Sequence, residues 1–267
     1  MNVYLFDNLK KQFARVGAEL RFEIDDTLSS AFEVDVVLEK GCELFEFRIS
    51  EQALNHLELT VLDIKERSKH LVLLARLADE NGEILNKEHF LLGYDERHLF
   101  VASIDPASTV DGARQSLKPP EISLRESGVN KEKRHRRRTK LFKRQGEWFF
   151  LPVDIEPDPL LVLRKEPLVR SAGGKPHIAD LAYRYGGVAV RVCSRYPWGL
   201  TLEQYAAHIK NQPSLATKFD WQDRRRNAAV FVKGKIRHPD HGTLTLSSWH
   251  RVLMNRERGS ERVVFLD

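Results

Sequence analysis

The last thirty residues contain histidines whose spacing could support acid–base or metal chemistry. His238, Asp240 and His241 lie within four residues in the segment HPDHG, and His250 follows nine residues after His241. Imidazoles act as general acids, general bases and metal ligands near neutral pH. Two histidines around a carboxylate therefore indicate an acid–base pair or a group of metal ligands. An ordinary hairpin turn with solvated polar side chains is the competing interpretation.

The alternation around His250 predicts which way its side chain points. Side chains in a strand point to alternate faces, so His250 shares its face with mostly apolar neighbours: Leu244, Leu246, Ser248, Val252 and Met254. We therefore expect His250 to be buried. A buried imidazole needs a hydrogen-bond partner, and it serves as a core residue, a ligand or a base.

A glycine-rich segment that ends at His177 could bind phosphate. Gly173, Gly174 and Lys175 precede Pro176, and residues 177–187 (HIADLAYRYGG) show apolar residues at helical spacing. A helix that begins here would direct its free N–H groups at an anion. The competing interpretation is a flexible turn before the helix. The segment is not a P-loop, because that motif requires Gly at 169 and Ser or Thr at 176.

No standard metal signature fixes the chemistry of these histidines. The chain contains no HExxH, no CxxC and no carboxylate-rich loop, and the His-x-Thr step of HGTLTL occurs once, whereas a two-histidine phosphoesterase needs it twice. A hydrolase interpretation nevertheless supplies a catalytic set. Its members are His177, His238, Asp240, His241 and His250. One histidine would act as base and another as acid, or two of them would hold a divalent metal with Asp240; a divalent metal is expected only under that interpretation, and its identity stays open.

A dense run of basic residues leads into three aromatic residues. Nine Lys and Arg side chains lie between Lys131 and Arg144, followed by Trp148, Phe149 and Phe150. A second cluster, at residues 224–226, lies close to Trp221. Basic side chains neutralise phosphates, and aromatic rings stack on unpaired bases. The predicted nucleic-acid contacts are Lys133, Arg134, Arg136, Arg137, Arg138, Lys140, Lys143, Arg144, Trp148, Trp221, Arg224, Arg225 and Arg226. A solvated loop, or a patch docked on acidic residues, is the competing interpretation.

Charge is distributed unevenly along the chain. The net charge is +5, but residues 1–120 hold 14 Lys and Arg against 22 Asp and Glu, a net of −8, so residues 121–267 carry +13. The asymmetry predicts nucleic acid, either RNA or single-stranded DNA, as a partner of the basic part and a protein as a partner of the acidic part. The two parts could also attract each other.

Composition argues against a membrane protein and for a cytoplasmic one. Charged residues make up 30% of the chain, and no run approaches the roughly 18 apolar residues of a spanning helix. The first residues do not resemble a signal peptide. Cys42 and Cys193 offer neither a disulfide framework nor a cysteine zinc site, which favours a reducing compartment.

The elements expected around these residues give an α+β fold. Residues 1–104 begin with a helix and continue in short alternating strands, which predicts an acidic, β-rich domain with an antiparallel meander or small barrel. Residues 105–135 are rich in Pro, Ser, Gly and Asp and predict a linker or long surface loop. Residues 136–267 predict a basic α+β domain, with a helix that begins in a capping box at Thr201 and Gln204 and a hairpin joined by HPDHG.

Three functions follow from these features. The leading hypothesis is a nucleic-acid-binding protein that uses the basic, aromatic-flanked part of the chain. The alternative is a histidine- or metal-dependent phosphodiesterase or nuclease. A non-catalytic protein-interaction module is the third hypothesis.

Overall fold

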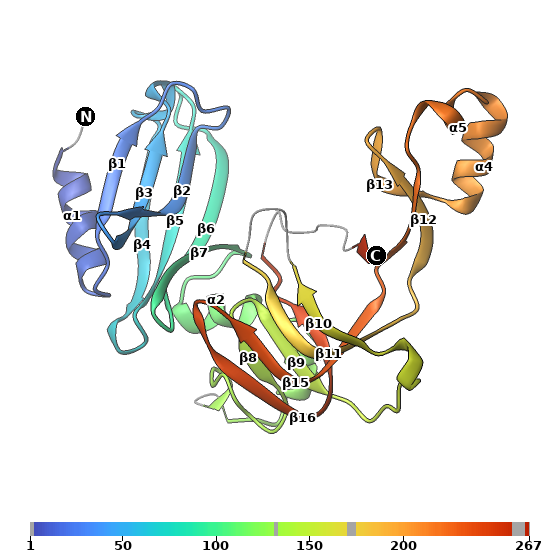
Figure 1. Cartoon of the computed structure of the whole chain (residues 1–267). Coiled ribbons are helices and arrows are strands. Elements are labelled where there is room, and N and C mark those ends of the chain that lie inside the picture. The colour runs from blue at the N-terminus through green and yellow to red at the C-terminus, as the bar shows by residue number, and fades with distance from the viewer. Residues whose placement is uncertain (1–2, 131–132, 170–174, 258–264, 267) are drawn as a thin grey trace. The chain divides into compact units, whose positions relative to one another are not determined.

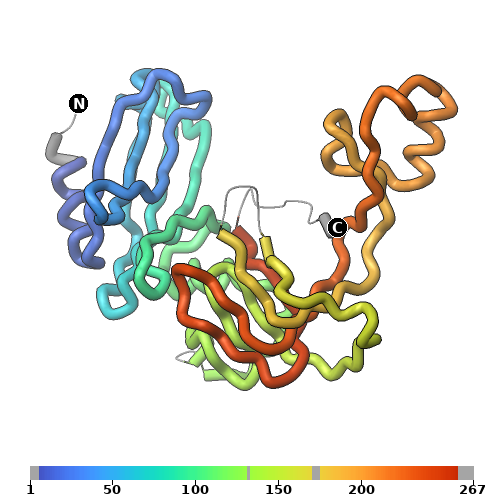
Figure 2. The backbone as a smooth tube through the Cα atoms, viewed as in Figure 1, coloured from blue at the N-terminus to red at the C-terminus, as the bar shows by residue number. Residues whose placement is uncertain are grey.

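The computed structural model describes residues 3–130, 133–169, 175–257 and 265–266. The chain divides into two compact units, Met1–Arg137 with Asn255–Ser260 and Arg138–Met254 with Glu261–Asp267 (Figure 1). Both units are rich in strands, which form several mainly antiparallel sheets, and short helices accompany them. Figure 2 traces the backbone through both units.

The first unit contains two sheets. The three-stranded sheet has the order β1-β3-β2, formed by β1 (Leu20–Ile24), β2 (Phe32–Glu39) and β3 (Cys42–Ile49). The four-stranded sheet is an antiparallel meander of β4 (Leu57–Lys65), β5 (His70–Ala78), β6 (Ile84–Asp95) and β7 (His98–Ile104). The meander was expected from the alternating pattern. β1 differs from the expectation, because it runs parallel to β3.

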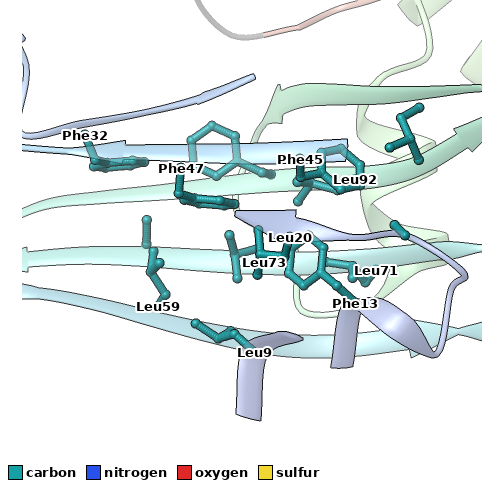
Figure 3. Close-up of a cluster of buried hydrophobic side chains, with 14 of the residues drawn as sticks. Leu9, Phe13, Leu20, Phe32, Phe45, Phe47, Leu59, Leu71, Leu73 and Leu92 are labelled. Atoms are coloured by element: carbon teal, nitrogen blue, oxygen red, sulfur yellow. The ribbon is translucent and has the colours of Figure 1, made fainter. Parts of the chain in front are cut away.

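One hydrophobic core joins the two sheets and the first helix. Phe45 and Phe47 from β3 meet Leu71 and Leu73 from β5, and Phe13 from α1 (Val3–Ala14) closes the cluster (Figure 3). The Phe13 and Phe45 rings pack edge to face with centroids 5.5 Å apart. Burying this apolar area is the main driving force for folding of the unit.

The segment 105–135, for which the sequence predicts a linker, contains two short helices. These are α2 (Val110–Ser116) and α3 (Pro120–Arg125). Val110 and Ala113 of α2 pack against the outer face of the meander, at Val72 and Leu91. The segment is therefore a layer of the first unit rather than an extended connection. Within the described ranges, short 3-10 turns lie at η1 (Glu51–Ala53), η2 (Glu66–Ser68) and η4 (Pro159–Leu161).

A six-stranded sheet forms the centre of the second unit. Its order is β10-β11-β15-β16-β9-β8. The strands are β8 (Lys143–Gln145), β9 (Trp148–Pro152), β10 (Leu163–Leu168), β11 (His177–Tyr185), β15 (Ala229–His238) and β16 (His241–Met254). Trp148 of β9 and His177 of β11 have ring centroids 6.3 Å apart, although two strands separate them in the sheet. In a flat sheet β9 and β11 would lie about 14 Å apart, so the sheet curls around its buried face.

A smaller sheet in the second unit has the order β13-β12-β14-β17. It consists of β12 (Val188–Cys193), β13 (Tyr196–Thr201), β14 (Gln222–Arg226) and β17 (Phe265–Leu266), accompanied by α4 (Leu202–Asn211) and α5 (Leu215–Lys218). The capping box predicted at Thr201 and Gln204 is present at the start of α4.

The helix predicted over residues 177–187 is wrong, because these residues form β11. A bulge between Ala179 and Leu181 shifts the strand's alternation by one residue. As a result His177, Ala179 and Ala182 all face the core, a spacing that imitates one face of a helix. Among the described residues, no helix is both long enough and apolar enough to cross a membrane.

Candidate metal centre

Three of the predicted histidines converge in the second unit. His177 begins β11, His238 ends β15 and His241 begins β16. One ring nitrogen from each can be chosen so that all three lie within 4.8 Å of one another. The cluster therefore unites the glycine-rich segment and the HPDHG turn, two features that lie sixty residues apart in the sequence.

The β15–β16 hairpin positions two of the three imidazoles. The strands extend further into HPDHG than its sequence suggests, so only Pro239 and Asp240 remain as the connection, and His238 pairs directly with His241. Residues directly opposite on antiparallel strands have neighbouring side chains. The two rings accordingly lie with centroids 4.8 Å apart.

His177 completes the cluster from the adjacent strand. Its side chain is 1% exposed, and neither ring nitrogen has a hydrogen-bond partner among the described residues. Its ring centroid lies 4.2 Å from that of His238 and 5.6 Å from that of His241. Burial, and then the neighbouring His238 and His241, lower the pKa of His177 to about 3. The imidazole is therefore neutral at physiological pH and keeps a lone pair.

Backbone contacts determine the tautomer of His238. Its Nδ1 accepts the N–H of Asp240 at 3.1 Å, so the proton belongs on Nε2, which donates to the Lys175 carbonyl at 3.1 Å. Metal-binding histidines commonly donate their second ring N–H to a backbone carbonyl in this way. Coordination through Nδ1 would keep the bond to Lys175 and would release the Asp240 amide.

Gly146, in the turn between β8 and β9, faces the same space. A Cβ atom at this residue would lie 3.0 Å from Nε2 of His241 and 3.4 Å from Nε2 of His177. The turn is fixed to the hairpin by Gln145, whose Nε2 donates to the Gly242 carbonyl at 2.6 Å. Sequence reasoning missed Gly146, because nothing local marks a lone glycine as the neighbour of a distant histidine pair.

This donor set fits a divalent transition metal. Imidazole nitrogen suits zinc, copper, nickel and iron, and three protein ligands leave a coordination position for water or substrate. Tetrahedral zinc with bonds of about 2.0–2.1 Å would hold the three nitrogens about 3.3 Å apart. The nitrogens lie within 4.8 Å of one another, so the cluster needs a contraction of about 1.5 Å at most to reach that geometry. Burial and then His241 lower the pKa of His238 against the opposing charges of Asp240 and Glu147, so this ligand is neutral as well.

Lys175 lies beside the three histidines, and Arg144 contacts the turn that carries Gly146. Arg144 donates from Nε to the carbonyl of Gly146 at 2.8 Å. Lys175 forms an ion pair with Asp240 at 2.8 Å. Arg144 was predicted as a nucleic-acid contact and Lys175 as a phosphate ligand; of the two, Lys175 contacts the cluster, through the His238 ring.

His250 does not belong to this cluster. The predicted burial is confirmed, since the side chain is 4% exposed and its Nδ1 bonds to the Ser248 carbonyl at 2.8 Å. It lies nine residues beyond His241 on the same strand, a separation of about 30 Å. His250 therefore lies too far along β16 to share a site with the other predicted histidines, and it is a buried core residue.

The predicted phosphate site is only partly described. Gly173 and Gly174 lie outside the described residues. Lys175 leads into strand β11 and not into a helix, so the argument from a helix N-terminus does not apply. Lys175 remains relevant through its contacts with His238 and Asp240.

The basic run crosses the division between the two units, and its members differ in environment. Arg134 bonds to the backbone carbonyl of Val129, and Arg137 forms ion pairs with Asp95 and Glu96. Lys143 donates to the Thr245 carbonyl. From residue 133 onward, the basic side chains of the run that remain exposed are those of Lys133, Arg136, Arg138 and Lys140.

The predicted aromatic contacts are less accessible than the sequence implied. Trp148 is 7% exposed and belongs to the core of the six-stranded sheet, so its ring is not available to stack on a base. Trp221 is half-buried, stacks on Tyr196 and donates to the Leu215 carbonyl. In the second basic cluster Arg225 is exposed, whereas Arg224 and Arg226 are half-buried.

The geometry thus selects a three-histidine centre, His177, His238 and His241, with Gly146 facing the nitrogens and with Lys175 at its side. Comparison with protein-family models, curated proteins and solved structures found no match to this chain.

Proposed function

We propose that this chain is a metal-dependent phosphodiesterase whose ion is bound by His177, His238 and His241. The observation that carries the proposal is the convergence of three imidazoles, those of His177, His238 and His241. Among them, the buried His177 has no hydrogen-bond partner among the described residues. Leaving a buried polar group unpaired costs about 1–3 kcal/mol. A ligand bond to a metal supplies the missing partner.

The centre has the parts that hydrolysis requires. A divalent ion in such a site lowers the pKa of bound water toward neutrality and polarises a phosphoryl oxygen. Lys175 can stabilise negative charge that develops on phosphate, and the acidic Asp240 favours a cation nearby. The net charge of +13 on residues 121–267 supports a polyanionic substrate.

The first test is metal binding and activity measured on the same samples. Protein stripped with chelator is titrated with Zn²⁺, Mn²⁺ and Ni²⁺, and hydrolysis of bis(p-nitrophenyl) phosphate is followed at each step. We expect one ion per chain and hydrolysis that requires it. His241→Ala should weaken ion binding at least about tenfold. His208→Ala, an exposed histidine on α4, is the control and should change neither property.

Circular dichroism spectra and melting curves of each variant separate loss of the ion from loss of the fold. A folded protein that takes up no ion at this cluster would remove the proposal. Stoichiometric ion binding without hydrolysis of any phosphodiester would leave a structural metal centre and would refute the assigned activity.

Nucleic-acid binding without cleavage is the second candidate. The observation in its favour is the exposure of four basic side chains within eight residues, Lys133, Arg136, Arg138 and Lys140. Such side chains contact phosphates with little sequence specificity. Binding that is retained in chelator, with no cleavage when metal is added, would favour this candidate.

A further inference from the structure

A groove of about 760 Å³ opens in the second unit beside the end of β11. Its lining includes Tyr183, Arg184 and Tyr185 from β11 and Arg224 and Arg225 from β14. We call these five residues and the space between them the tyrosine–arginine groove.

The groove is formed where two strand connections approach each other closely. Gly187 follows β11, and Ala228 precedes β15. A Cβ atom on Gly187 would lie only 2.8 Å from the carbonyl oxygen of Arg226 and 2.9 Å from the Ala228 nitrogen. Arg225 also donates from Nη1 to the Gly186 carbonyl at 3.2 Å. These backbone contacts hold one wall of the groove in place.

Aromatic rings line one side of the groove. Tyr183 and Tyr185 lie on the same face of β11 and stack with centroids 6.2 Å apart and planes 25° apart. Phe231 on the neighbouring strand extends the row, with its centroid 6.1 Å from that of Tyr183. The side chain of Tyr185 is 67% exposed. A large aromatic ring left in water next to a row of rings offers a platform for another flat ring.

Positive charge lines the other side. The residues that line the groove include three arginines, Arg184, Arg224 and Arg225, and one acidic residue, Asp223. Asp223 forms an ion pair with Arg191 at 3.0 Å. The guanidinium of Arg184 bonds to Glu166 through Nη2. The charge within the groove is therefore positive, which favours an anionic occupant.

We infer that the tyrosine–arginine groove binds single-stranded nucleic acid. Stacking on Tyr185 requires a base with a free face, which a duplex keeps inside its own stack. Guanidinium groups across the groove pair with the backbone phosphates. The inference rests on the proposed function in one respect, namely that the bound strand would be the substrate of the phosphodiesterase. Binding in the groove itself needs no ion.

The experiment is a fluorescence titration of a labelled U-rich 12-mer RNA, the same DNA sequence and a matched duplex, in chelator at two salt concentrations. We expect the single strands to bind more tightly than the duplex. Tyr185→Ala should raise Kd about tenfold or more, as expected for one lost stacking contact. The double variant Arg224→Gln with Arg225→Gln should raise Kd and flatten the salt dependence.

Three controls make the result specific to the groove. Tyr185→Phe keeps the ring and should bind normally. Trp198→Ala removes another exposed aromatic residue of the same unit, on β13, and should have little effect. The double variant Arg136→Gln with Arg138→Gln removes charge from the basic run and should weaken binding less than the groove variants.

The outcomes for the groove and for the proposed function are separable. Groove-dependent binding without hydrolysis would support the inference and would count against the phosphodiesterase. Three results would overturn the inference and leave the metal centre untouched. Binding could be insensitive to Tyr185→Ala, it could be competed away by polyglutamate, or it could depend only on the basic run.

Discussion

His177 shows how its position changes the chemistry of a single imidazole. In water the pKa of this imidazole would be about 6.5. The fold buries the ring, which keeps it uncharged at neutral pH, and places His238 and His241 beside it. An uncharged ring with an available lone pair is the form that binds a metal. His177 thus combines two properties that a surface histidine lacks: a ring that is uncharged and can coordinate an ion, and a ring orientation fixed by burial.

Gly146 should be as important to the centre as a ligand. Its φ of +57° favours glycine, and a Cβ atom would enter the space that the nitrogens of His177 and His241 face. We expect Gly146→Ala to weaken metal binding at least about tenfold by blocking that space. Isothermal titration with Zn²⁺ measures the effect.

Gly186→Ala is the matched control. Gly186 lies in the same unit with a φ of +74°, and a Cβ atom there would meet nothing within 4 Å. Both substitutions carry the backbone cost of a left-handed residue, about 1–2 kcal/mol, and only one meets the histidines. Equal affinities in the two variants would show that the ion does not occupy the space beside Gly146.

At the scale of elements, a bulge and a hairpin decide the site. The bulge in β11 turns His177, Ala179 and Ala182 to the same side, which leaves the histidine facing the core. The two-residue connection of β15 and β16 places the other two histidines opposite each other. Both features are backbone arrangements, and together they bring the three imidazoles to one end of the curled sheet.

A buried ion pair anchors the segment that contains α2 and α3. Lys118 is 5% exposed and Glu126 is 2% exposed, and the Lys118 ammonium donates to Glu126 at 2.6 Å and to the carbonyl of Arg134 at 2.6 Å. We expect Glu126→Gln to destabilise the first unit by about 3–5 kcal/mol, because the variant leaves a buried ammonium without its countercharge. Urea unfolding measures the change.

An exposed pair in the same unit provides the comparison. Arg76 and Glu58 form a surface ion pair at 2.9 Å, and Glu58→Gln should cost no more than about 1 kcal/mol. Replacing both buried partners, with Lys118→Met and Glu126→Leu, should recover much of the stability lost in Glu126→Gln. Similar small losses for the buried and the exposed single variants would contradict this account of the segment.

At the scale of the whole molecule, both units contain a histidine that burial keeps neutral. Burial lowers the pKa of His135 in the first unit to about 4 and that of His177 in the second unit to about 3. The unfolded pKa is near 6.5. Each histidine therefore stabilises its unit fully above pH 6.5, and that contribution is lost as pH falls toward the folded pKa, by up to about 1.4 kcal/mol per pH unit.

We expect acid to destabilise both units, and single substitutions should separate the two contributions. His135→Gln should reduce the pH dependence of unfolding in the first unit between pH 6.5 and 4. His177→Gln should do so in the second unit between pH 6.5 and 3. Unfolding followed by hydrogen exchange assigns each transition to its unit. A pH profile unchanged by either substitution would mean that folding leaves the pKa of these histidines near the unfolded value.

Local patterns in the sequence were enough for several features. Alternation predicted the meander and the buried face of His250, and the spacing of Thr201 and Gln204 predicted the start of α4. HPDHG predicted a hairpin and two histidines close together. These predictions succeed because each depends on residues within a strand or a turn, where side-chain direction follows from backbone period.

Tertiary structure alone decided the rest. His177 joins His238 and His241, Gly146 faces them, and Tyr185 and Arg224 line one groove, because the sheet curls and two strand connections approach each other closely. The same sequence period around residue 177 fits a helix and a bulged strand, so spacing could not choose between them. The choice depended on burial of the β11 face against strands from distant parts of the chain, and a local pattern does not contain those long-range contacts.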